Sequence, residues 1–248
     1  MLIVAGTGTD VGKTFVTCAL LVALRRRRVR VGAWKPVASG VQGESSPDSD
    51  AHAAALGAPV PPPLHLFLPP ISPHLAARQA GVFLELDALA ARARALAEGH
   101  EVFLVETAGG LFTPLSEKTT NADLARALGG HLLLVAPDRL GVLHDLGATL
   151  RAARAVGLSE AVVVLSAPER PDASSGSNAA EVERTLGQRV ASVFPRGAVE
   201  DEAIQRSAEA TLTALGLSKL TATIAALASR EGLRHEPRRR RKILSGEG

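Results

Sequence analysis

The residue types best suited to chemistry gather in one glycine-rich segment, Gly6-Thr-Gly-Thr-Asp-Val-Gly-Lys-Thr14, which lies between two apolar stretches. The preceding run, Leu2–Ala5, predicts a buried strand, and the following run, Phe15–Leu24, predicts a helix. A strand, a glycine loop and a helix in this order are typical of a phosphate-binding loop, whose N–H groups face the anion. Lys13 would then reach the outer phosphates, and the Thr14 hydroxyl would be offered to Mg²⁺.

The spacing of the loop differs from the usual one. Five residues separate Gly6 from Gly12, whereas four residues normally lie between the first glycine and the Gly-Lys pair. The alternative is a glycine-rich turn that only begins a helix. Because the strand context and the Gly-Lys-Thr sequence occur together, the phosphate-binding interpretation is favoured.

Polar residues follow two other predicted strands. Lys35 and Ser39 come after the apolar segment 29–34, and Glu106 comes directly after the segment 101–105. Ligands of an open parallel sheet bind outside the carboxyl ends of its strands, so these side chains are expected to converge on the loop. Glu106 suits a ligand of the same Mg²⁺. The simpler alternatives are a solvated glutamate at a strand end and a surface lysine before a turn proline.

Asp50 is a candidate for a second carboxylate at the metal, and Asp48 competes with it. Both lie where a short helix over 50–56 is predicted to begin, with Ser49 or Asp48 as its N-cap. The histidines and the single cysteine show no metal-ligand spacing, and the absence of a Gly-x-Ser-x-Gly elbow argues against an α/β-hydrolase.

Apolar strands and amphipathic helices alternate along the chain. Strands are predicted at 2–5, 29–34, 101–105, 132–136, 161–165 and 190–194, and helices at 15–24, 50–56, 84–96, 121–128, 142–156 and within 200–230. Continuously apolar strands are typical of a sheet buried on both faces, so the pattern predicts a single doubly wound, mostly parallel α/β sheet flanked by helices. The proline-rich stretch 59–73 and the stretch 168–178 are predicted to be irregular.

Composition predicts one domain over residues 1–229, followed by a basic, disordered tail over 230–248. The 248 residues carry a net charge of +3, and the tail alone holds seven Arg or Lys against three Glu. The body therefore offers no basic stripe for nucleic acid, and no apolar segment approaches the ~20 residues that span a membrane. The lone Cys18 and the lack of a signal-peptide pattern predict a cytoplasmic protein.

Five motifs resemble those of the ATP-dependent dethiobiotin synthetases, P-loop enzymes of biotin biosynthesis, in the family's order and spacing. The widened loop spacing is the family's own form. The motifs are Gly6–Thr14, Trp34-Lys-Pro-Val-Ala-Ser-Gly40, Ser49-Asp50-Ala51, Ser72-Pro-His74 and Val105-Glu-Thr-Ala-Gly-Gly-Leu-Phe-Thr-Pro-Leu-Ser116.

This resemblance implies a P-loop NTPase fold and a reaction in which 7,8-diaminononanoate, CO₂ (or bicarbonate) and ATP give dethiobiotin, ADP and phosphate, with Mg²⁺ as the metal. One amine captures CO₂ as a carbamate, whose oxygen attacks the γ-phosphate to form a carbamic-phosphoric anhydride. The second amine then closes the cyclic urea and expels phosphate. The family is a homodimer, so the segment Leu140–His144 is expected to complete the partner's site.

Residue roles follow from the resemblance by position. The implied catalytic residues are Lys13, Lys35, Thr9 and Ser39, of which the last three would also contact the substrate. The implied metal ligands are Thr14, Asp50 and Glu106. The implied nucleotide contacts are Asp10, Val11, Gly12, Lys13, Thr14, Phe15, Asp50, Glu106, Thr107, Ala108 and Gly109.

Some positions depart from the family pattern. Thr107 stands where a glycine commonly follows the metal-binding glutamate, and Asp10 stands where many members have glutamate. The strand around Val164–Ser166 lacks the Asn-Asp pair that members often place against adenine. Base recognition is therefore expected from Pro195, Arg196 and Gly197, and the choice of nucleotide stays open.

Two other P-loop proteins are alternatives. A switch ATPase of the partitioning or maturation type commonly carries a signature lysine early in the loop, where this chain has Thr7 and Gly8. A glutamine-dependent amidotransferase synthetase would need a glutaminase domain with a nucleophilic cysteine, and Cys18 lies within the first predicted helix.

Overall fold

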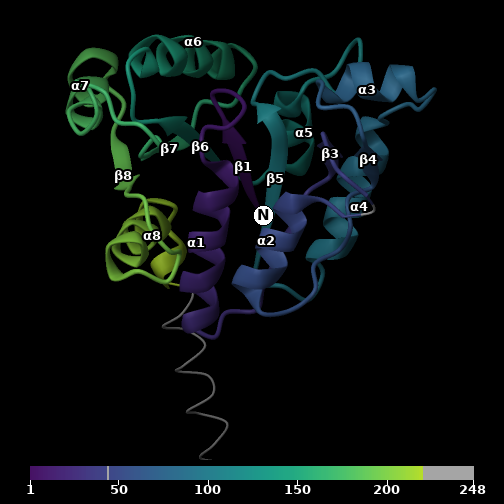
Figure 1. Ribbon diagram of the computed structural model, residues 1–248, viewed down its shortest axis with the longest axis horizontal. Coiled ribbons are helices and arrows are strands. Elements are labelled where there is room, and N and C mark those ends of the chain that lie inside the picture. Colours follow the sequence, from purple (N-terminus) through teal and green to yellow (C-terminus); the bar gives the residue numbers. More distant parts are fainter. Residues whose placement is uncertain (44, 220–248) are drawn as a thin grey trace, which may run out of the picture.

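A six-stranded sheet forms the centre of the protein (Figure 1). The computed structural model describes residues 1–43 and 45–219, so the predicted basic tail lies outside the described residues. The strand order is β2-β5-β1-β6-β7-β8, and every neighbouring pair in this sheet is parallel. The strands are β1 (Leu2–Gly6), β2 (Val31–Trp34), β5 (Val102–Gly110), β6 (His131–Pro137), β7 (Ala161–Ser166) and β8 (Val190–Phe194).

Helices cover both faces of this sheet, which confirms the predicted doubly wound α/β fold (Figure 1). On one face lie α1 (Lys13–Arg26), α2 (Pro47–Leu56) and α8 (Glu202–Ala214). On the other lie α4 (Leu86–Ala97), α5 (Asn121–Leu128), α6 (Val142–Ala155) and α7 (Asn178–Leu186). A 3₁₀ turn, Leu217–Lys219, follows α8. None of the described helices is both long and apolar enough to cross a membrane.

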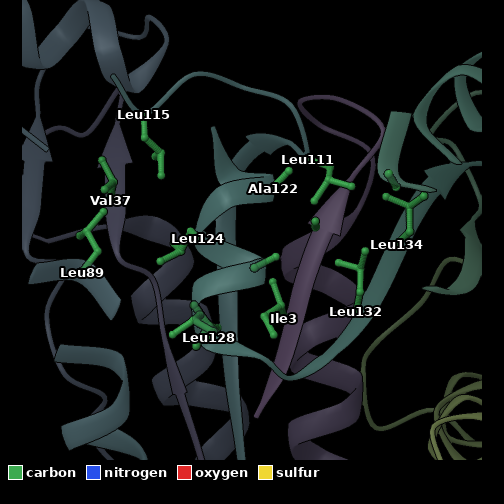
Figure 2. Packing of buried hydrophobic residues seen from close by; sticks show 14 of the residues in the cluster. Ile3, Val37, Leu89, Leu111, Leu115, Ala122, Leu124, Leu128, Leu132 and Leu134 are labelled. Carbon is green, nitrogen blue, oxygen red and sulfur yellow. The ribbon is translucent and has the colours of Figure 1, made fainter. Parts of the chain in front are cut away.

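The central strand β1 is buried along its whole length because each face meets a helical layer. Successive strand residues point to opposite faces, so β1 divides its side chains between two cores. Leu2 and Val4 pack with the residues of α1 and α8. Ile3 belongs to the opposite core, where Figure 2 shows it among Leu124, Leu128, Leu132 and their neighbours.

Helix α1 begins directly at the phosphate-binding loop and is apolar on nearly every side. It is enclosed by the sheet, α2 and α8, so its apolar side chains are buried on nearly every side. The single cysteine, Cys18, lies buried in it, as predicted, and burial raises the pKa of its thiol to about 12. Arg25 and Arg26 occupy the last turn, where their positive charges interact favourably with the negative end of the helix dipole.

Three parts of the fold differ from the sequence-based expectation. The proline-rich crossover is not wholly irregular, because β4 (His65–Phe67) pairs in parallel with β3 (Val37–Ser39), and α3 (Pro73–Gln79) follows. Helix α7 was not predicted. Helix α2 begins at Pro47 with Ser46 as its N-cap, rather than with Ser49 or Asp48. A proline at the first helical position is favourable since its missing N–H has no helical partner.

We expect Leu104→Ala to lower the free energy of unfolding by about 2–5 kcal/mol, because Leu104 is fully buried in β5 and truncation leaves a cavity. Leu68→Ala is the matched control, since that leucine is 67% exposed, and it should change stability by about 0.5 kcal/mol or less. Urea titration followed by circular dichroism measures both. Equal losses in the two variants would contradict this description of the core.

Candidate active site

The phosphate-binding loop connects β1 to α1 at the carboxyl edge of the sheet (Figure 1). The Thr7 N–H donates to the Val135 carbonyl of β6 at 3.0 Å and holds the start of the loop. Within the described part of the chain, the N–H groups of residues 8–15 donate to no protein acceptor. A row of free N–H groups that runs into a helix N-terminus is suited to an anion, which is the arrangement that the sequence predicts.

The loop backbone depends on glycine at position 12. Gly12 has a φ of +94°, and a Cβ there would lie 2.4 Å from the Ser166 Oγ at the end of β7. Asp10 also has a positive φ, 55°, without being glycine. A residue other than glycine keeps a positive φ only where its surroundings hold the backbone in place. Residues of this kind are often found at functional sites.

Lys13 is buried and curls back over the loop, where its Nζ donates to the Gly8 carbonyl at 3.0 Å. Burial, and then the nearby Lys35 ammonium, lower the pKa of Lys13 to about 8. Its charge is therefore poorly compensated by the protein itself. A bound polyphosphate would supply the missing negative charge.

Lys35, Asp48, Glu106 and Thr14 form one cluster beside the loop. The Lys35 Nζ lies 2.6 Å from the Asp48 Oδ2 and 2.8 Å from the Glu106 Oε1. The Thr14 Oγ1 lies 2.7 Å from the Asp48 Oδ1 and 2.8 Å from the Glu106 Oε1. The cluster joins residues from α1, α2, the end of β2 and β5.

The charges of this cluster are mutually stabilised. Burial alone would raise the pKa of Glu106, but the Lys35 charge and the hydrogen bond from His52 outweigh it and hold the pKa well below its usual range. Burial likewise disfavours the Lys35 ammonium, yet Glu106 and Asp48 outweigh that effect and raise its pKa. The pair is therefore ionised at neutral pH.

The oxygen atoms of the cluster fit Mg²⁺. The Thr14 hydroxyl has a single proton but lies within hydrogen-bond distance of two carboxylates, so it can donate to only one of them. Oxygen atoms that approach one another in this way suit a hard cation. No group of three or more His, Cys, Asp or Glu side chains is arranged for a metal among the described residues, so phosphate oxygens would have to share the coordination.

Two cavities meet at the loop. The larger, of about 740 Å³, joins the cluster to Thr9, Ser39, Gly109, Thr113 and the segment Pro70–Pro73. The smaller, of about 360 Å³, lies on the other side of Gly12 and Phe15. It is also lined by Arg139, Ser166, Glu169, Arg196 and Gly197.

The structure brings most of the predicted site residues together around these cavities and leaves out three. The Thr107 side chain is buried and its hydroxyl donates to the Val4 carbonyl at 3.4 Å. Pro195 does not line the smaller cavity, although Arg196 and Gly197 do. Asp50 is exposed and accepts a hydrogen bond from the Ser45 hydroxyl at 2.9 Å.

The expectation for Asp50 is therefore corrected, because Asp48 takes its place beside Thr14 and Lys35. Two residues along a helix differ by about 200° in direction, so the two carboxylates of α2 cannot face the same site. The sequence placed them only two residues apart and offered no way to choose between their faces. His52, which sequence reasoning missed, lies one turn after Asp48 and contacts Glu106.

A comparison of two matched variants tests this correction. Asp48→Asn should weaken the binding of Mn²⁺ in the presence of ATP by about tenfold or more, because it removes a charge from the oxygen cluster. Asp50→Asn makes the same chemical change on the exposed side of α2 and should leave binding within about twofold of the parent, as surface substitutions usually have small effects. Electron paramagnetic resonance of Mn²⁺ measures both, and the reverse order would restore Asp50 to the site.

Three comparisons with known proteins agree with this geometry. A family model described as an AAA domain matches residues 1–202. An ATP-dependent dethiobiotin synthetase from Anaeromyxobacter sp. strain Fw109-5 is 42% identical over 194 residues, which is 75% of this chain and 86% of the relative. The synthetase from Caulobacter vibrioides strain NA1000 is 41% identical over 195 residues, which is 75% of this chain and 84% of that relative.

The fold is also similar to that of a solved ParA family ATPase from Chlorobium tepidum, with a TM-score of 0.51 at 15% identity over 92% of this chain and 96% of the other. That similarity supports the P-loop NTPase architecture alone. The sequence relatives are more specific, and the AAA-domain match covers most of the chain. The chain belongs to the family of ATP-dependent dethiobiotin synthetases.

Proposed function

We propose that this chain is an ATP- and Mg²⁺-dependent carbon–nitrogen ligase that forms dethiobiotin from 7,8-diaminononanoate and CO₂ in biotin biosynthesis. The observation that carries the proposal is the larger cavity, in which the phosphate-binding Lys13 and a second lysine, Lys35, face the same space. Family membership supports the choice of substrate.

The chemistry requires two anions to react. A carbamate oxygen must approach the γ-phosphate, and the two negative charges repel each other unless fixed cations lie beside both. Lys13 would hold the outer phosphates, and Lys35 would stand beside the carbamate and the transferring phosphoryl group. Thr14, Asp48 and Glu106 would hold Mg²⁺, which supplies further positive charge at the phosphates when bound.

The remaining steps need orientation more than acid–base strength. Once the carbamate oxygen bonds to phosphorus and ADP leaves, the second amine attacks the carbonyl carbon and phosphate departs, which leaves the cyclic urea. Thr9 and Ser39 line the same cavity and would orient the reacting nitrogens and the carbamate. The segment Pro70–Pro73 and Thr113 also line this cavity, and the carbon chain of the diamine would lie against them.

The smaller cavity is the proposed base site. Phe15 and Gly12 separate it from the reacting groups, and Arg139, Glu169 and Arg196 give it charged walls. We further propose a homodimer in which the segment Leu140–His144 reaches the partner's site, supported by the 77% exposure of the Leu140 side chain. A cytoplasmic location stays a prediction from the sequence.

The direct test is an assay with 7,8-diaminononanoate, bicarbonate and MgATP, with CTP and GTP in parallel. We expect one ADP for each dethiobiotin formed, identified by mass spectrometry. A nonanoate with a single amine is the control, since it can form a carbamate but cannot close the ring. ATP hydrolysis that does not respond to the diamine would instead favour a switch ATPase of the partitioning or maturation type.

Isotopic labelling tests the proposed intermediates in the same assay. With freshly dissolved CO₂ that carries ¹³C and ¹⁸O, the ¹³C should enter the urea, and one ¹⁸O should appear in the released phosphate. The label moves because the carbamate oxygen that attacks phosphorus leaves with it. Dethiobiotin formation without ¹⁸O in phosphate, under conditions where CO₂ retains its label, would contradict the anhydride.

Lys35→Ala should lower kcat by about 10²–10³-fold, because it removes a fixed cation beside the developing charge. The KM for ATP should change less, since Lys13 and the loop N–H groups remain. Lys118→Ala, at an exposed loop position, is the matched control. Steady-state kinetics measures both variants, and a Lys35→Ala enzyme with near-parent turnover would remove Lys35 from the mechanism.

A further inference from the structure

His52 is a fully buried residue of α2 whose imidazole is directed at the active site. Its Nε2 lies 2.8 Å from the Glu106 Oε2 in β5, and both side chains are completely shielded from solvent. His52 follows Asp48 by four residues, so the two lie on the same face of α2. That face therefore contacts the site twice, through Asp48 at Thr14 and Lys35 and through His52 at Glu106.

The contacts of the Glu106 carboxylate are divided between its two oxygens. Oε1 lies 2.8 Å from both the Thr14 hydroxyl and the Lys35 ammonium, whereas Oε2 contacts His52. Because the carboxylate is ionised, it can only accept, so His52 presents the proton on Nε2. This bond restricts the orientation of the carboxylate, and with it the direction of Oε1.

Among the residues that the structure describes, His52 makes no other polar contact that would account for its presence. Its Nδ1 is buried and, in the described part of the chain, has no hydrogen-bond partner. The simpler explanation is that the ring only fills space. Burial of a polar ring without a role would be costly, and the surrounding helix positions 51, 53, 54 and 55 are all alanine, so helix packing alone does not call for an imidazole.

We propose that His52 is a positioning residue that holds the Glu106 carboxylate toward the metal and phosphate side of the site and fixes α2 against β5. The proposal rests on the proposed function, because it assigns Glu106 a role at the metal. Residues that orient a metal-binding side chain typically contribute about 10–100-fold to metal affinity or activity. His52 would act through Glu106 and would touch neither substrate nor nucleotide.

Two substitutions separate the hydrogen bond from the shape of the ring. His52→Gln extends an amide nitrogen to roughly the reach of Nε2 and should retain a donor for Glu106, whereas the shorter His52→Asn should not reach it. Mn²⁺ binding in the presence of ATP, without diamine, is measured by electron paramagnetic resonance. We expect His52→Asn to weaken Mn²⁺ binding by about tenfold or more and His52→Gln to stay within about threefold of the parent.

Kinetics with the diamine supplies a second measurement. His52→Asn should lower kcat and raise the Mg²⁺ concentration needed for half-maximal turnover. For His52→Gln, we expect both quantities to lie close to those of the parent. His131→Gln, at an exposed position at the amino end of β6, is the matched control and should match the parent. Thermal unfolding of each variant identifies a general loss of structure.

The outcomes decide the proposal. Parent-like Mn²⁺ binding by His52→Asn would overturn it. It would also be overturned if His52→Asn and His52→Gln weakened Mn²⁺ binding equally and in proportion to their loss of thermal stability. If His52→Asn does not fold, His52→Leu, which fills similar volume without a donor, replaces it in the comparison with His52→Gln. Because the binding measurement omits the diamine, a failure of the proposed reaction would appear only in the kinetics. The effect of the His52 variants on Mn²⁺ binding could still be interpreted.

Discussion

The site depends on the buried ion pair between Lys35 and Glu106. Their atoms lie 2.8 Å apart, and Glu106 is completely shielded from water. An isolated charge in such a place is expensive, so each member remains ionised because the other, together with the polar groups around the pair, compensates its charge. Removal of one partner from a buried pair costs about 3–5 kcal/mol, which explains why Asp48, Thr14 and His52 surround the pair with further polar contacts.

The parallel sheet makes this pair possible. Strands β2, β5 and β1 are neighbours and all end at the same edge, so Lys35 after β2, Glu106 in β5 and the loop after β1 meet there. Parallel neighbours need a long crossover connection, and the one from β2 to β5 contains α2 and the segment Pro70–Pro73. The crossover therefore supplies both the second carboxylate and one wall of the larger cavity.

The phosphate-binding loop separates two cavities with different linings. Towards β7 and β8, the smaller cavity is lined by Ser166 and Arg196 and suits a base. Towards β5 and β2, the larger cavity holds the two lysines and suits reacting anions. A ParA family ATPase shares the sheet, so the architecture alone does not choose between a switch and a ligase. The side chains of the larger cavity carry that distinction, because function resides in a site rather than in the fold.

The sheet, the loop and the convergence of Lys35 and Glu106 could all be predicted from the sequence, because continuous apolar strands and strand-end positions restrict where such residues can lie. It did not decide between Asp48 and Asp50 or reveal His52. Those outcomes depend on where α2 begins, which is at Pro47, and on how the helix is rotated about its axis. Tertiary packing of α2, chiefly against α1, decided which of its faces meets Glu106, and no local sequence pattern contains that information.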